Sequence, residues 1–271
     1  MLGFDGLPPE VAQNCEANAI ATVSLDLGAQ GVVLLANADS PYLSCLTSDQ
    51  VMTVWGAAAS LETPVSTWDM VSPDFPADPV YTFAPSAGSG PIDIVLTPAE
   101  GPVGILRDDV TETNSDPRYR AAAVANAPGS ITMLSWQDYQ TVLESEQTGY
   151  QVVAVDGGDG CVTPTEEHIL DATYPLNRQA QLIISQSELV RPEVQSLLWF
   201  MFSDANFSTY QLSGFFGINQ PDLLRLRADL QALFAEAQAA ALEVAPEATP
   251  EATPEITPEA TAESTAEGDG S

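Results

Sequence analysis

The sequence predicts a mixed α/β fold. Three observations support this class: short runs rich in β-branched and aromatic residues, segments of helical apolar spacing between them, and sufficient length and apolar content for a core. The chain has 271 residues, of which 45% are hydrophobic and 17% charged, a composition typical of folded domains. Strands that alternate with helices along a chain are characteristic of α/β proteins.

The expected strands are short and are bounded by turn-forming residues. We expect them at residues 21–25, 31–35, 79–83, 131–134, 150–155 and 181–185.

Four segments have the apolar spacing of helices, at residues 8–17, 46–55, 191–202 and 221–242. We expect Thr47 or Ser48 to begin the second, Pro192 to lie in the first turn of the third, and Asn219 to cap the fourth. The third contains the most apolar run of the chain and is expected to be buried. That run is much shorter than the roughly 20 residues that a membrane-spanning helix needs.

The C-terminal segment, residues 243–271, is expected to be a disordered acidic tail. A Pro-Glu-Ala-Thr unit repeats along it, and such a segment buries too little apolar surface to offset the entropy of ordering. A spacer and a solubilising tail are both consistent with this composition.

The charge balance excludes one class of partner. The chain carries 38 acidic and seven basic residues, and all seven are arginine. Binding to a nucleic-acid backbone requires clusters of Lys and Arg, so we expect no nucleic-acid partner. The scattered acidic residues favour solubility rather than one particular cationic partner.

No motif indicates catalysis. The single histidine, His168, is expected at the surface of a short helix, and the GxSxG, HExxH and P-loop patterns are absent from the sequence. Cys15, Cys45 and Cys161 form no CxxC pair, so no zinc site is expected. We therefore expect a binding protein that is not an enzyme and has no cofactor.

A loop of small residues is the candidate binding site. Residues 87–91 follow the expected strand at 79–83 and precede a short apolar segment. Backbone N–H groups at the beginning of a helix can bind an anion. Gly88, Ser89 and Gly90 are therefore candidate oxyanion ligands, although Gly-Ser loops also occur as ordinary turns.

An ordered series of motifs resembles the PstS-type phosphate-binding proteins of bacterial ABC transporters. The motifs lie between about residues 5 and 240, and their order makes the resemblance specific. They are EVAQNCEANAI at 10–20, GVVLLAN at 31–37, LTSDQVMTVW at 46–55, TW at 67–68, PDFP at 73–76, SGP at 89–91, RDD at 107–109, VDGGDGCVTPTEE at 155–167 and YPLNR at 174–178.

This resemblance implies a two-lobed, type 2 periplasmic-binding-protein fold with crossovers at residues 31–37 and near Tyr174. Lobe I would comprise residues 1–36 and 174–242, and lobe II residues 37–173. The implied function is capture of phosphate or a related oxyanion for an ABC permease by an extracytoplasmic monomer. The implied ligands are Gly88, Ser89, Gly90 and Arg107, with Arg118 and Arg120 as further candidates, and the resemblance also implies a disulfide between Cys15 and Cys45.

The sequence departs from the family pattern in ways that keep a second function open. The match begins after the family's first phosphate-binding loop, so we expect an incomplete lobe I, with either a signal peptide upstream of Met1 or a truncated gene. Pro91 replaces a threonine and so removes an N–H and a hydroxyl. Asp116-Pro117-Arg118 and Thr132 also differ from the family's residues. The alternative is a degenerate relative without ligand, acting as an extracellular interaction or sensor module.

Overall fold

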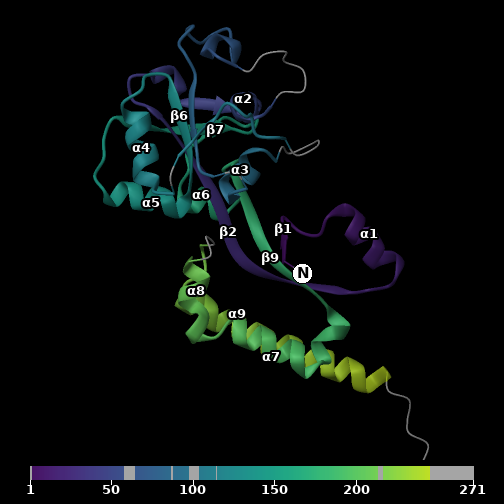
Figure 1. Ribbon diagram of the computed structural model, residues 1–271. Coiled ribbons are helices and arrows are strands. Elements are labelled where there is room, and N and C mark those ends of the chain that lie inside the picture. Colours follow the sequence, from purple (N-terminus) through teal and green to yellow (C-terminus); the bar gives the residue numbers. More distant parts are fainter. Residues whose placement is uncertain are drawn as a thin grey trace, which may run out of the picture.

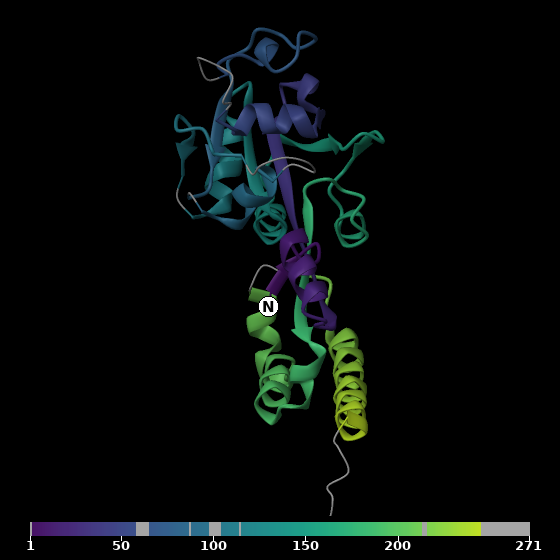
Figure 2. The ribbon, with the colours of Figure 1, turned by 90° about the vertical axis from the view of Figure 1, so that its right-hand side faces the viewer.

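The chain folds into two packed units that share one long strand, β2 (Thr22–Asn37) (Figures 1 and 2). The structure, a computed structural model, describes residues 2–57, 65–86, 88–97, 104–113, 115–212 and 216–244. The sequence predicted two separate strands within β2. They form one strand because a register shift between Asp26 and Ala29 lets the pairing with β9 (Asn177–Ser185) continue past Gly28.

The large unit is a mixed sheet around the second half of β2. Strands β6 and β7 pair antiparallel with this half, β4 and β5 extend the sheet beyond β6, and β3 and β8 pair with β7. The bounds are β3 (Cys45–Thr47), β4 (Tyr81–Ala84), β5 (Thr111–Glu112), β6 (Ser130–Ser135), β7 (Tyr150–Asp156) and β8 (Cys161–Val162).

Helices cover both faces of this sheet. Leu34 packs on one face with α2 (Ser48–Trp55) and α3 (Gly90–Val95), whereas Leu35 packs on the other with α4 (Pro117–Ala125) and α5 (Trp136–Glu144). Successive residues of a strand point to opposite faces. A strand buried on both faces therefore needs a continuous apolar run, which the segment GVVLLA supplies.

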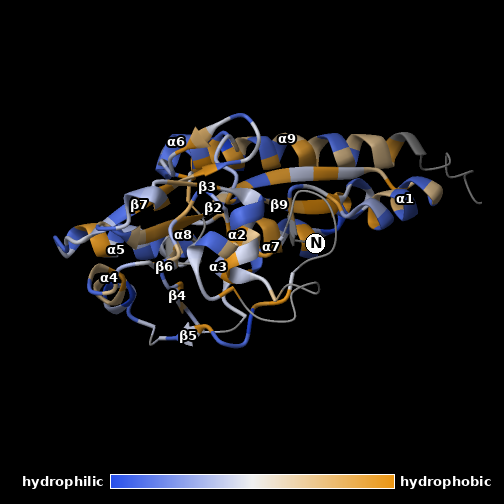
Figure 3. Ribbon diagram, turned by 90° about the horizontal axis from the view of Figure 1, so that it is seen from above, coloured by the Kyte–Doolittle hydropathy of each residue, from blue (hydrophilic) through white to orange (hydrophobic). Residues whose placement is uncertain are grey.

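The small unit is an antiparallel sheet, β1 (Leu2–Phe4), β9 and the first half of β2, with helices on one face. Leu25 and Leu27 point into a core formed with α7 (Pro192–Met201) and α9 (Gln220–Val244), whereas Ser24 and Asp26 are exposed. This alternation is typical of a sheet covered on one side. Figure 3 shows the corresponding apolar and polar bands along α9.

All four expected helices are confirmed, as α1 (Pro9–Ala17), α2, α7 and α9. Helix α1 matches its prediction, Thr47 forms a complete capping box at α2, and Asn219 Oδ1 accepts a hydrogen bond from the Asp222 amide at the beginning of α9. Residues 243 and 244, expected in the tail, are instead the last residues of α9. Residues 245–271 of the expected tail lie outside the described residues. No helix in the described ranges has the length and apolar content needed to cross a bilayer.

Helix α7 is less buried than the sequence predicted. Leu198 and Phe202 are each 3% exposed, but the side chains of Leu197 and Phe200 are 57% and 63% exposed. Only one side of α7 packs, against α9 and the short helix η3 (Gln186–Val190). A helix that is apolar all round is usually buried. Here Leu197 and Phe200 instead form an apolar face that the described residues leave exposed.

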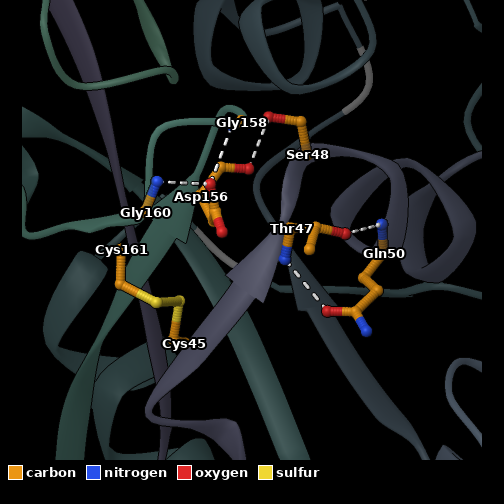
Figure 4. Close-up of a disulfide and its surroundings, with 8 residues drawn as sticks. All are labelled: Cys45, Thr47, Ser48, Gln50, Asp156, Gly158, Gly160 and Cys161. Atoms are coloured by element: carbon orange, nitrogen blue, oxygen red, sulfur yellow. Dashed lines mark hydrogen bonds between the residues drawn. A yellow bond between two sulfur atoms is a disulfide. The ribbon is translucent and has the colours of Figure 1, made fainter.

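A disulfide joins β3 to β8 in the large unit (Figure 4). It links Cys45 to Cys161, which are 116 residues apart. The Asp156 carboxylate accepts hydrogen bonds from the amides of Gly158 at 2.7 Å and Gly160 at 2.9 Å, which orders the loop that leads to Cys161.

The expected pairing of Cys15 with Cys45 is therefore wrong, and Cys15 is a free thiol. Cys15 lies in α1, which precedes β2 beside the small unit, whereas Cys45 follows β2 in the large unit (Figure 1). A strand of this length spans about 50 Å, so β2 keeps the two cysteines apart.

Removal of the disulfide should lower the free energy of unfolding by about 2–5 kcal/mol, because a cross-link over a long loop restricts the unfolded chain. The test is urea denaturation of a Cys45→Ser/Cys161→Ser variant against the wild type without reductant. Cys15→Ser is the matched control and should leave the midpoint unchanged. Equal stability of the double variant and the wild type would contradict a stabilising role.

Candidate functional site

The loop of small residues lies where α3 begins. Gly88 has a φ of 79°, a conformation that glycine adopts without steric cost, and it turns the chain into Ser89. Helix α3 then anchors the loop, because Ile92, Ile94 and Val95 are buried in the core of the large unit. Pro91 suits a first helical turn but provides no N–H. Figure 1 shows α3 beside the upper end of β9, where β9 meets the middle of β2.

Ser89 and Gly90 carry hydrogen-bonding groups that the described residues do not use. Ser89 is the N-cap residue of α3, yet its side chain makes no capping bond. Its Oγ is shielded from solvent and has no hydrogen-bond partner in the described part of the chain. The Gly90 amide likewise makes no backbone hydrogen bond with a described residue. A buried polar group without a partner lowers the stability of the fold by about 1–3 kcal/mol. A ligand that accepts hydrogen bonds from Ser89 and Gly90 would remove this cost.

Arg178, near the beginning of β9, is the cationic side chain beside this loop. A β-carbon at position 90 would lie 3.6 Å from Arg178 Nη2. The Arg178 Nε donates a hydrogen bond to Gln30 Oε1 at 2.8 Å, and the guanidinium lies 3.9 Å from the centre of the Phe4 ring. Burial lowers the pKa of the Arg178 guanidinium, and the negative charges of Asp93 and Asp5 oppose that shift.

Arg107, an expected ligand, is instead bonded within the large unit. It is 7% exposed. Its guanidinium forms a bidentate pair with Asp109, at 2.5 and 2.7 Å, and also donates to the carbonyls of Val54 at 3.1 Å and Val65 at 2.7 Å. The pair holds the pKa of the Asp109 carboxyl below its usual value. These bonds use most of the donors of Arg107, so we assign this residue to stability and leave it out of the site.

The two further candidates are also paired. Arg118 bonds to Asp116 at the beginning of α4, where both side chains are exposed. Arg120 is 1% exposed and bonds to Asp138 at 2.8 Å, which ties α4 to α5. Because each guanidinium already bonds to a carboxylate, we place neither arginine in the candidate site.

A concave region lies between the small sheet and α9. Its volume is about 330 Å³, and its lining includes Asp26, Asp222, Asp229 and Arg225. Three carboxylates against one guanidinium disfavour an anion there, and Arg225 already pairs with Asp222. The junction beside Ser89 is therefore the better candidate for an anion.

The sequence identified the loop but missed the cation beside it. Arg178 belongs to the YPLNR segment, which contributes to the family resemblance but carries no expected ligand. The available signal was its position at the expected crossover near Tyr174, since a residue at a crossover can contact both units. The pairing of Gln30 with Arg178 and of Gly31 with Asn177 shows that β2 and β9 meet there.

Two α/β units joined by crossover strands, with a polar loop at their junction, define a two-lobed binding-protein fold. The same fold occurs in the crystal structure of a possible phosphate binding protein from Planctomyces limnophilus, with a TM-score of 0.72 and 22% identity over 87% of this chain and 80% of that one. PstS from Borrelia burgdorferi gives a TM-score of 0.57 and 15% identity, over 81% and 79% of the two chains.

Sequence similarity leads to the same group of proteins. Protein SphX from Synechocystis sp. is 23% identical over 194 residues, which are 71% of this chain and 56% of SphX. The phosphate-binding protein PstS from Staphylococcus haemolyticus is 23% identical over 181 residues, which are 66% of this chain and 53% of that protein. No family model matches. The resemblance to PstS-type proteins is thus confirmed, and the chain spans about half the length of these relatives.

Replacement of Arg107 should lower the stability of the folded protein. Arg107→Ala is expected to lower the free energy of unfolding by about 2–4 kcal/mol, because the buried carbonyls of Val54 and Val65 lose their donor. Urea denaturation measures the change. Arg118→Ala removes an exposed ion pair and is the control, with an expected effect below about 1 kcal/mol. Wild-type stability of Arg107→Ala would show that these bonds contribute little.

Proposed function

We propose that this chain is part of an extracytoplasmic solute-binding protein that captures phosphate or a related oxyanion for an ABC importer. The observation that carries the proposal is the pair of unused donors at Ser89 and Gly90, beside Arg178, where the two units meet. An oxyanion needs several charge-assisted hydrogen bonds to offset the loss of its hydration. A hydroxyl, a backbone amide and a guanidinium at one junction provide donors of the required kinds.

The proposed lobes are residues 1–36 with 174–242 (lobe I) and residues 37–173 (lobe II). Separate cores support this division, since Leu25 and Leu27 pack with α7 and α9, whereas Leu34 packs with α2 and α3. Gly31 lies at the crossover, where a β-carbon would come within 2.6 Å of the Ile169 side chain. The apolar face of α7, which the described residues leave exposed, supports an incomplete lobe I that further polypeptide would cover.

The disulfide and the relatives support an extracytoplasmic transport role. Disulfides such as Cys45–Cys161 persist mainly in oxidising compartments. The relatives of the same fold include a protein described as an ABC-type phosphate transport receptor from Vibrio cholerae, with a TM-score of 0.51 and 17% identity. We propose an ABC permease as the partner, and binding without catalysis as the activity.

The second candidate function is an interaction or sensor module that has lost its ligand. Pro91 favours it, because this residue removes a donor from the loop, and so does the internal pairing of Arg107. The two functions differ in one measurable property, the affinity of the chain for oxyanions.

Isothermal titration calorimetry with phosphate tests the proposal, with sulfate and arsenate in parallel. The transport function predicts saturable binding of one anion per chain. An absence of heat at millimolar concentrations of all three anions would favour the module without ligand.

Ser89→Ala links such binding to the loop. The substitution should weaken phosphate binding about 10- to 100-fold, because a hydrogen bond to a charged group contributes about 1.5–3 kcal/mol. It should not destabilise the ligand-free protein, since the hydroxyl has no partner to lose among the described residues. Ser187→Ala, at an exposed serine, is the control. Unchanged phosphate affinity in Ser89→Ala would remove this loop from the site.

A further inference from the structure

Arg178 is the one arginine that forms no ion pair with any described residue. The chain has seven arginines and no lysine, and its formal net charge is −31. Each of the other six arginines bonds to a carboxylate; these are Arg107, Arg118, Arg120, Arg191, Arg225 and Arg227. Because the chain has 38 acidic residues, an arginine without a carboxylate partner among the described residues is distinctive.

The contacts of Arg178 fix its side chain but leave its outer donors unused. Nε is bonded to Gln30, and the Phe4 ring covers the guanidinium. No hydrogen bond from Nη1 or Nη2 to a described residue is present, although a guanidinium has four N–H groups on these two atoms. Asp93 and Asp5 act on Arg178 through their charge, but neither forms an ion pair with it. The side chain is therefore held in place with an unused fork of donors.

We propose that Arg178 is the cationic ligand of the oxyanion site, and that it donates from Nη2 to an anion also held by Ser89 and Gly90. This inference rests on the proposed function. The planar fork of a guanidinium matches two oxygens of a phosphate group, and the 3.6 Å between Nη2 and the β-position of Gly90 lets one tetrahedral anion contact both. Arg178 thus takes the role that the sequence had suggested for Arg107.

An anion bound to Arg178, Ser89 and Gly90 would also link the two lobes. Ser89 and Gly90 lie at the beginning of α3 in the large unit, whereas Arg178 lies in β9, a strand of the small sheet. An anion that bonds to all three residues joins the two units. It therefore favours the arrangement in which they are closest, which is how a ligand drives closure of two domains.

The first test compares two variants that lose the same charge. Arg178→Gln should weaken phosphate binding by about 30-fold or more, as expected when one partner of a hydrogen-bonded charge pair is removed. Arg191→Gln removes an exposed arginine that pairs with Glu188 and Glu193 and should bind phosphate like the wild type. If the wild type binds phosphate and Arg178→Gln binds it equally well, the assignment of Arg178 is wrong and the proposed function stands. If the wild type binds no oxyanion, both are wrong.

A second measurement follows phosphate binding in the wild-type protein, and a variant serves only to assign one signal. With ¹⁵N-labelled arginine, the seven arginines give a simple spectrum of seven Nε–Hε signals. Phosphate should shift the Arg178 signal, which is assigned by its loss in Arg178→Lys, more than it shifts the Arg191 signal. An Arg178 signal that stays unchanged at saturating phosphate would overturn the proposal.

A double-mutant cycle tests whether Gly90 and Arg178 act on the same anion. Gly90→Ala adds a methyl group beside Nη2, at ordinary contact distance, and should weaken phosphate binding without unfolding the chain. If one anion lies between the two residues, Gly90→Ala should have a much smaller effect in the Arg178→Gln background. Strictly additive effects of the two substitutions would contradict a shared anion.

Discussion

The pairing of β2 with β9 is the constraint on which the rest of the structure depends. The first half of β2 pairs with β9 in the small unit, and its second half is the central strand of the large sheet. The two units therefore share a continuous backbone and not only a flexible linker. The position where β9 joins β2 also fixes Arg178 beside the loop that begins α3. A candidate site between two units thus follows from one strand pairing.

The distribution of charge is compatible with an anion at the proposed site, even in so acidic a chain. Six of the seven arginines are neutralised by nearby carboxylates, and these pairs support local structure, as Arg107 does around Val54 and Val65. The strong negative charge of the chain opposes anion binding at long range, but salt screens it beyond about 10 Å. Close hydrogen bonds from fixed donors then determine affinity, which is why a guanidinium that pairs with no described carboxylate matters.

The sequence predicted the elements that have a strong local signal. Thr47 and Asn219 cap helices through their own neighbours, and the apolar run in β2 requires burial on both faces, so these features were recognisable. Short strands such as β3 and β8 were missed because two or three residues show no periodicity. The Cys45–Cys161 bond, the partners of Arg107 and the position of Arg178 depend on contacts between distant segments, which spacing along the chain does not reveal. Likewise, the apolar run of α7 indicates a need for burial but not what covers it.

The most direct test of the central claim is a crystal structure of the protein with arsenate, located by its anomalous scattering. Arsenate has the shape and charge of phosphate, and its arsenic atom can be placed without reference to the protein atoms. The account predicts one dominant anomalous peak within hydrogen-bonding reach of Ser89, Gly90 and Arg178. A fully occupied peak elsewhere, or no peak at saturating arsenate, would contradict it.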